Sequence, residues 1–117
     1  MHAPEFEQLV AEAKKEVKEI GPAELKRMLD RGENFILIDV READEHAKGI
    51  ITSAVKLPRG ILERDINRVT TDKDRKIVLY CGGGYRSALA AVNLQKMGYK
   101  DVISLDGGWR GWQGMQS

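Results

Sequence analysis

The sequence KIVLYCGGGYRS, residues 76–87, indicates most directly how this chain folds. Residues 77–80 form a continuous apolar run, which is typical of a strand buried on both faces of a sheet. The glycines that follow allow a tight turn, and apolar residues then recur at helical spacing over 89–97. This order of strand, turn and helix predicts an α/β domain with Cys81 at the carboxyl end of the strand.

Alternating helices and strands extend from this unit toward both ends of the chain. Helical spacing of apolar residues predicts helices at 5–16, 22–29, 60–69 and 89–97. Short apolar runs predict strands at 35–38, 76–80 and 101–105, with a weaker candidate at 54–57. The alternation predicts a parallel sheet covered by helices on both faces, with ligands bound beyond the carboxyl ends of the strands.

The length and charge of the chain narrow the class of protein. Its 117 residues fit one domain, and its net charge of +1 offers no electrostatic case for binding nucleic acid or a membrane. No apolar run approaches the roughly 20 residues that cross a bilayer. The N-terminus carries no apolar signal region, so we expect a cytoplasmic protein. An exported protein whose signal had been removed would have the same sequence.

Cys81 is the only cysteine, and the loop that it opens has the features of an anion site. A single cysteine excludes an intramolecular disulfide. Successive glycines before a helix direct backbone N–H groups inward, and such a nest favours a thiolate, as does the guanidinium of Arg86. Cys81 is therefore the predicted catalytic residue. The predicted substrate- or persulfide-binding residues are Gly82, Gly83, Gly84, Tyr85, Arg86 and Ser87.

Other interpretations of this loop fit the sequence less well. A buried, inert thiol would need neither three glycines nor a nearby arginine. A dinucleotide fingerprint would need a third glycine where Ser87 stands, and a nucleotide P-loop would need a lysine that this loop lacks. No cluster of His, Cys, Asp and Glu has metal-ligand spacing, so we expect neither a metal nor another cofactor.

Motifs spread over residues 17–113 resemble the rhodanese family in their order and spacing. They are DVRE at 39–42 with Glu45, GII at 49–51, Ala54 to Pro58, the loop from Cys81 to Arg86, Gly98-Tyr99, and DGGW at 106–109. The resemblance implies a five-stranded parallel sheet flanked by helices on both faces. One departure is Ile50, which stands where the family usually has a histidine.

The resemblance also implies an activity and a division of the chain. Cys81 would take sulfane sulfur from a small anionic donor such as thiosulfate, hold it as a persulfide, and pass it to cyanide, a small thiol or a protein thiol. The N–H groups of the loop would bind the persulfide. We expect an N-terminal helical extension over 1–16 and a rhodanese domain over 17–117, with neither nucleic acid nor a membrane as partner.

Charged residues after two other strands have expected structural or steering roles. Asp39 and Arg41 follow the strand at 35–38, and we expect them to form an ion pair or a loop tie with Glu45 near the site. Arg59 follows Pro58, where it would either steer anionic donors or remain solvated.

His46 and the two tryptophans are expected to lie outside the chemistry. A cysteine protease-like pair would use His46 as a base, but sulfur transfer from a preformed thiolate needs none, so we expect His46 at the surface or in a tie. Trp109 and Trp112 flank Arg110-Gly111 and are expected to form part of the core and a rim lid.

Two alternative functions remain open. The rhodanese fold is shared with dual-specificity phosphatases of the cell cycle, whose loop has the form Cys-x5-Arg. The spacing from Cys81 to Arg86 is one residue shorter, which suits a sulfur-sized anion better than a phosphate. Rhodanese-like domains also serve as interaction modules when they lack the cysteine, whereas this chain retains it.

Overall fold

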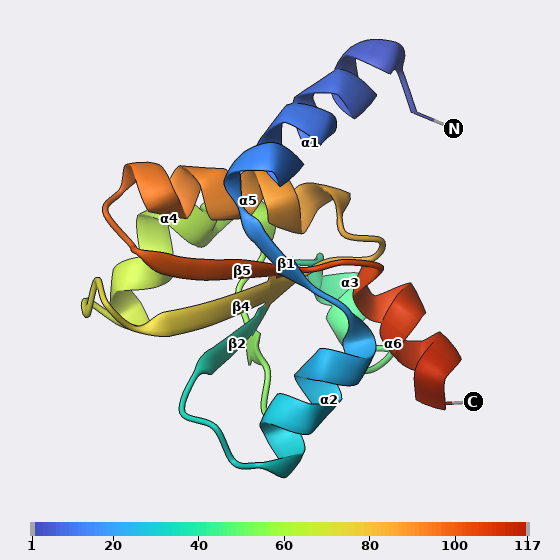
Figure 1. Ribbon diagram of the computed structural model, residues 1–117, viewed down its shortest axis with the longest axis vertical. Coiled ribbons are helices and arrows are strands. Elements are labelled where there is room, and N and C mark those ends of the chain that lie inside the picture. Colours follow the sequence, from blue (N-terminus) through green and yellow to red (C-terminus); the bar gives the residue numbers. More distant parts are fainter. Residues whose placement is uncertain (1, 117) are drawn as a thin grey trace.

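The computed structural model describes residues 2–116, which contain a five-stranded sheet in which all strand pairs are parallel. The strands are β1 (Lys18–Ile20), β2 (Ile36–Asp39), β3 (Val55–Lys56), β4 (Lys76–Tyr80) and β5 (Asp101–Leu105). Their spatial order is β1-β5-β4-β2-β3 (Figure 1). The predicted five-stranded parallel sheet is confirmed, and β4 occupies its centre.

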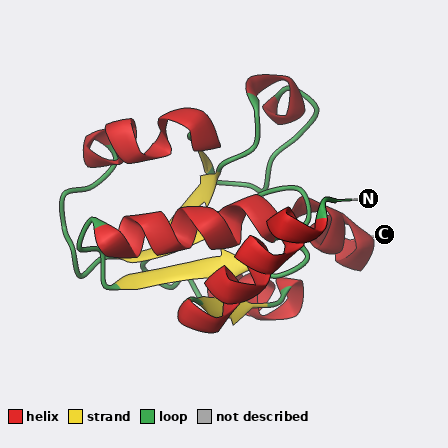
Figure 2. Ribbon diagram, turned by 90° about the horizontal axis from the view of Figure 1, so that it is seen from above, coloured by secondary structure: helices red, strands yellow, loops and turns green. Residues whose placement is uncertain are grey.

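Helices cover both faces of this sheet, as expected for a parallel sheet. They are α1 (Pro4–Glu16), α2 (Pro22–Asp30), α3 (Ala43–His46), α4 (Leu62–Asp65), α5 (Tyr85–Lys96) and α6 (Gly108–Gln116), with the 3-10 turns η1 (Arg59–Ile61) and η2 (Ile66–Arg68). In Figure 1, α1, α4 and α5 lie above the sheet, and α2 and α6 lie below it. Seen from above in Figure 2, helices lie across the yellow strands.

The side chains of β4 alternate between two cores because successive residues of a strand point to opposite faces. Ile77 and Leu79 of β4, and Cys81 directly after the strand, belong to the core beneath α1, α4 and α5. Val78 and Tyr80 belong to the core that α2 and α6 cover. All five residues are almost fully buried, which explains why residues 77–80 of β4 form a continuous apolar run.

Several elements differ from the sequence predictions. β1 was missed because it has only three residues, two of them charged, and it forms an edge of the sheet. The helix predicted over 60–69 is wrong as a single element, since the chain there forms η1, α4 and η2 in succession. The short helix α3 and the glycine-rich helix α6 were also missed.

The N-terminal helix α1 packs on the same face of the sheet as α5. Val10 and Ala13 of α1 are buried, and α1 makes its contacts mainly with α5. The division of the chain at residue 17 stays a prediction. Among the described residues, no helix is long and apolar enough to cross a membrane.

Candidate active site

Cys81 directly follows β4 at the carboxyl edge of the sheet, and its side chain is almost completely enclosed, with 1% of the residue exposed. The chain then turns through the glycines and enters α5 at Tyr85. Gly84 makes this turn with φ +97°, a backbone conformation that residues with a side chain rarely adopt. A Cβ on Gly84 would also lie only 3.2 Å from the backbone nitrogen of Gly107, so both conformation and space require glycine here.

The sulfur of Cys81 accepts hydrogen bonds from the backbone at the start of α5. The N–H groups of Gly84 and Ser87 donate to Sγ at 3.1 Å and 3.4 Å. These N–H groups have no partner within the helix, so the sulfur takes the place of a capping side chain. The positive end of the α5 dipole adds to their effect, and the site therefore favours negative charge on sulfur.

Two buried hydroxyl groups continue this arrangement behind the sulfur. Ser87 Oγ lies 3.5 Å from Cys81 Sγ, and Ser104 Oγ of β5 lies 2.7 Å from Ser87 Oγ. A thiolate has no proton to donate, so in that state Ser87 must donate to sulfur and accept from Ser104. The sequence analysis missed Ser104 because nothing in the sequence of β5 relates it to the loop.

The first turn of α6 holds the loop from the other side. The N–H groups of Trp109 and Arg110 donate to the carbonyl oxygens of Cys81 and Gly82 at 2.7 Å and 3.0 Å. Gly108, with φ +55°, packs so closely that a Cβ would overlap the Cys81 carbonyl oxygen. The DGGW motif at 106–109 therefore brings α6 against the loop that follows Cys81.

A cavity of about 500 Å³ opens above the sulfur. Its lining residues are His2, Phe6, Cys81, Gly82, Gly83, Tyr85, Arg86 and Arg110. Two guanidinium groups thus face the cavity, and no Asp or Glu of the described chain is among its lining residues. This composition suits an anionic ligand.

Arg110 is a second cation that the sequence analysis did not place at the site. Its guanidinium lies against the glycine turn, where a Cβ on Gly82 would come within 3.2 Å of Nη1 and one on Gly83 would overlap Nη2. Within residues 2–116 it has no carboxylate partner, whereas Arg86 lies 3.6 Å from Glu45. Only its position soon after the DGG segment could have suggested its place, because that segment returns the chain to the loop.

The ion pair expected near the site is present and buried. Arg41 Nε donates to both carboxylate oxygens of Asp39 at 3.1 Å. Its Nη2 donates to Asp39 Oδ2 at 2.8 Å and to the carbonyl oxygen of Gly49 at 2.6 Å. Burial opposes ionisation of Asp39, but its hydrogen bonds with Arg41 outweigh that effect and hold the pKa of the carboxyl below its usual value. The pair ties the end of β2 to the 49–51 segment.

Glu45 and His46 take separate places beside this pair. Glu45 accepts from the N–H of Glu42 at 2.9 Å in a capping box of α3, and it faces Arg86. His46 is buried, not at the surface, and its Nε2 lies 3.2 Å from Asp39 Oδ1 without the geometry of a hydrogen bond. Glu45 therefore links α3 to Arg86 of the Cys81 loop, and His46 packs beside Asp39.

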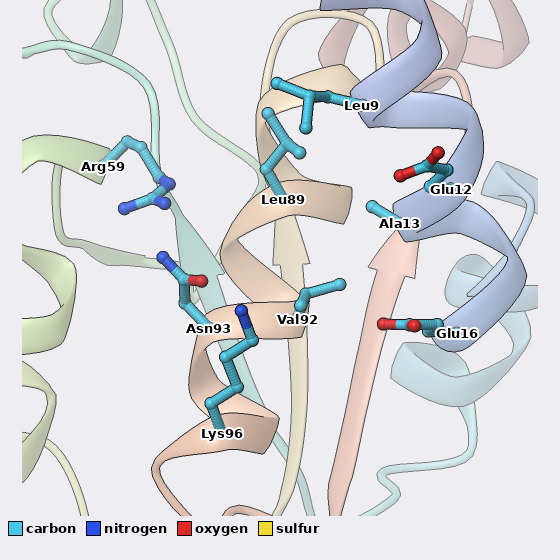
Figure 3. Close-up of a pocket in the computed structure, with 9 residues that line it drawn as sticks. All are labelled: Leu9, Glu12, Ala13, Glu16, Arg59, Leu89, Val92, Asn93 and Lys96. Carbon is cyan, nitrogen blue, oxygen red and sulfur yellow. The ribbon is translucent and has the colours of Figure 1, made fainter.

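Arg59 is not brought into the Cys81 cavity. Its Nη1 donates to Glu63 at 2.7 Å and 2.8 Å, and its side chain lines a separate groove between α1 and α5. Figure 3 shows Arg59 on the side of this groove opposite to α1. The ion pair with Glu63 on the next turn explains this orientation, which does not support direct steering of a donor to Cys81.

The tryptophans pack against the second core, as expected for part of a core and its rim. Trp109 stacks on Tyr80 with ring centroids 6.5 Å apart and lies beneath the guanidinium of Arg41 at 4.6 Å. Trp112 also packs on this core. No group of three His, Cys, Asp or Glu residues in the described part of the chain could hold a metal ion.

A cysteine thiol held at a strand end by helix N–H groups, beneath a cavity lined by two arginines, defines a class of α/β proteins built around a loop cysteine. Residues 21–115 match the rhodanese-like domain, so the chain belongs to the rhodanese-like family. This finding confirms the family that the sequence motifs indicate. The matched range leaves α1 and β1 outside it.

Relatives in sequence carry names that fit this family. The putative sulfurtransferase YtwF of Bacillus subtilis is 38% identical over 99 residues, which cover 85% of this chain and 93% of the relative. A sulfurtransferase of Allochromatium vinosum is 35% identical over 96 residues, covering 82% and 88%. The chain therefore belongs among rhodanese-like sulfurtransferases by similarity along most of its length.

Solved structures agree with the fold. A rhodanese-like domain protein of Staphylococcus aureus has a TM-score of 0.75 and 30% identity, covering 82% of this chain and 91% of its own. A protein of unknown function from Rhodopseudomonas palustris, described as a possible tyrosine phosphatase, has a TM-score of 0.87 and 28% identity. It covers 100% of this chain and 95% of its own, so the similarity includes α1.

Proposed function

We propose that this protein transfers sulfane sulfur through a persulfide on Cys81. The Cys81 thiolate attacks the outer sulfur of a donor such as thiosulfate, forming a new S–S bond. The S–S bond of the donor breaks, and its electron pair leaves with sulfite. Cyanide or a thiolate then attacks the outer sulfur of the persulfide, which releases thiocyanate or a new persulfide and restores the Cys81 thiolate.

The observation that carries this proposal is the environment of the sulfur. Sγ accepts from the N–H groups of Gly84 and Ser87 and lies at the floor of a cavity that also contains Arg86 and Arg110. These donors would lower the energy of the thiolate before the reaction and of the persulfide anion after it. Attack by a thiolate needs no general base, so the isoleucine at position 50, where the family usually has a histidine, does not affect this chemistry.

The near-complete burial of Cys81 suits a small sulfur atom as the group transferred. An enclosed thiolate excludes bulky electrophiles, while the outer sulfur of a persulfide would extend into the cavity, where an acceptor can reach it. The two guanidinium groups would attract the anionic donor and stabilise the charge on the departing group.

An intact-mass measurement tests the proposal. After incubation with thiosulfate and removal of excess reagent, we expect the mass of the protein to rise by that of one sulfur atom. Addition of cyanide should restore the original mass and yield thiocyanate. Cys81→Ser provides the matched control, because it keeps the shape of the side chain without the nucleophile. No added sulfur in the wild-type protein would contradict the proposal.

A phosphatase is the second candidate, and the Rhodopseudomonas palustris structure described as a possible tyrosine phosphatase favours it. A phosphatase loop must enclose a phosphate group, and a carboxylic acid usually protonates the leaving oxygen. The short spacing from Cys81 to Arg86 and the absence of Asp and Glu from the described lining of the cavity weigh against it. Steady hydrolysis of p-nitrophenyl phosphate, with no persulfide formed from thiosulfate, would decide for the phosphatase.

A further inference from the structure

The cavity above Cys81 has two chemically different walls. Arg86 and Arg110 form a cationic wall, whose Arg110 guanidinium rests on the glycine turn next to the sulfur. Phe6 and His2 of the N-terminal segment, together with Tyr85, form an aromatic wall. The centroid of the His2 ring lies 5.0 Å from the centroid of the Phe6 ring and 4.9 Å from that of the Tyr85 ring. The three rings therefore make one contiguous surface.

The N-terminal helix holds the aromatic wall in place. Buried Val10 and Ala13 fix α1 on α5, whose first residue is Tyr85. The Nζ atom of Lys14, one turn further along α1, lies 5.7 Å from the centre of the Tyr85 ring. The wall is therefore built from two elements that pack together, and Phe6 remains partly exposed toward the cavity.

An inorganic anion would use only part of this site. Thiosulfate has no apolar surface to place against Phe6, and cavities of roughly 300–1,000 Å³ are typical of sites that enclose organic molecules. The volume of about 500 Å³ lies within that range. A ligand that fills the site needs negative charge at one end, near the sulfur and Arg110, and apolar surface at the other.

We propose that the cavity selects an organic sulfane-sulfur donor, in which a negatively charged terminal sulfur group is joined to an apolar or aromatic substituent. Arg110 binds the charged group, and Phe6, His2 and Tyr85 bind the substituent. This inference rests on the proposed sulfur transfer and specifies its donor. With an organic thiosulfonate, the Cys81 thiolate takes the terminal sulfur, the S–S bond of the donor breaks, and its electron pair leaves with the sulfinate.

A comparison of two donors tests the proposal with the whole 117-residue chain. We compare kcat/KM for benzenethiosulfonate and for thiosulfate, with saturating cyanide as acceptor in both assays. The wild-type protein should prefer benzenethiosulfonate. Phe6→Ala should lower this preference by about five- to tenfold, since benzenethiosulfonate loses an aromatic contact that thiosulfate does not make. Arg110→Ala should lower kcat/KM for both donors by roughly tenfold or more.

Matched variants outside the cavity serve as controls. Leu9→Ala removes an exposed apolar side chain from the same helix, and Arg68→Ala removes an exposed arginine from η2. Neither should change the ratio between donors. His2→Ala provides a second test of the aromatic wall at an exposed position, in case Phe6→Ala disturbs the packing of α1.

The outcomes separate this inference from the proposed function. The inference alone would be overturned if thiosulfate forms a persulfide but the wild-type protein shows no preference for benzenethiosulfonate. It would also be overturned if the preference exists but is not reduced in Phe6→Ala and His2→Ala. Failure of the wild-type protein to form a persulfide with either donor would overturn both. A preference that falls in the wall variants and persists in Leu9→Ala supports the inference.

Discussion

Ser104 Oγ lies 2.7 Å from Ser87 Oγ in the protein interior, and Ser87 Oγ lies 3.5 Å from the sulfur of Cys81. Both serines are fully buried. The pair connects β5 to the start of α5 through side chains whose positions in the sequence are 17 residues apart. Ser104 therefore orients a hydroxyl group that itself faces Cys81, without contacting the substrate cavity.

This relationship makes Ser104 a positioning residue. Ser104→Ala should lower the free energy of unfolding by about 0.5–1.5 kcal/mol, because a buried hydroxyl loses its partner. If the same hydrogen bond helps to stabilise the thiolate, the rate of persulfide formation should fall by roughly two- to tenfold. Urea unfolding and single-turnover kinetics measure the two effects. Thr71→Ala, at an exposed position, should change neither, and an unchanged rate in Ser104→Ala would show that the pair acts on the fold alone.

Cys81 should be indispensable for transfer but not for folding. Cys81→Ser keeps a side chain of similar shape in the turn, so the free energy of unfolding should change by less than ~1.5 kcal/mol. Thiocyanate production from thiosulfate and cyanide should fall to background, because the chain has no other thiol. Thiocyanate assays together with circular dichroism check both statements. Near wild-type turnover in the variant would rule out the persulfide mechanism.

Arg86 should contribute mainly to donor binding. A hydrogen bond to a charged group is worth ~1.5–3 kcal/mol, so Arg86→Ala should lower kcat/KM for thiosulfate by roughly ten- to a hundredfold, chiefly through KM. Glu45→Gln removes the carboxylate that faces Arg86 at 3.6 Å and should have a much smaller effect. Arg27→Ala, on the exposed face of α2, is the control for loss of positive charge. An effect on kcat with KM unchanged would place Arg86 in the transition state instead.

Gly108 should tolerate no side chain, because α6 approaches the loop too closely. Gly108→Ala would bring a Cβ into overlap with the Cys81 carbonyl oxygen at a φ of +55°. We expect the free energy of unfolding to fall by about 1–3 kcal/mol, and sulfur transfer to fall with it because the loop must shift. Gly60→Ala is the matched control, since no atom lies within 4 Å of its Cβ position and its φ is not positive. Equal stability of the two variants would contradict this account.

The Asp39–Arg41 pair should make the free energy of unfolding depend on pH in the acidic range. The folded-state pKa of Asp39 lies below the unfolded value of about 3.9, so the folded state binds the proton less tightly. The contribution of the pair is therefore complete above pH ~3.9 and disappears as the pH falls through the folded-state pKa. Urea unfolding of the wild type and of Asp39→Asn between neutral and acidic pH measures the difference. That difference should shrink on acidification, whereas Asp44→Asn, at an exposed position, should leave the profile unchanged.

The sequence by itself determined the central elements of the fold and singled out the cysteine that we propose as the nucleophile. β4, β2 and β5 are identifiable because a parallel strand that is covered on both faces carries a mostly continuous run of apolar residues. Cys81 is identifiable because a glycine-rich turn between a buried strand and a helix places backbone N–H groups around one side chain. Asp39 and Arg41 are two residues apart, so their ion pair is a local property that the sequence displays.

Only the tertiary structure decided what surrounds the sulfur. Phe6, Ser104 and Arg110 each lie more than 20 residues from Cys81 along the chain, and none carries a local pattern that relates it to Cys81. Arg59 shows the converse, since it follows a strand end as a site residue would, yet its ion pair with Glu63 turns it toward another groove. The reason is physical: hydrogen bonds along the backbone and apolar periodicity act over a few residues, whereas the walls of a cavity are set by how whole helices pack on the sheet.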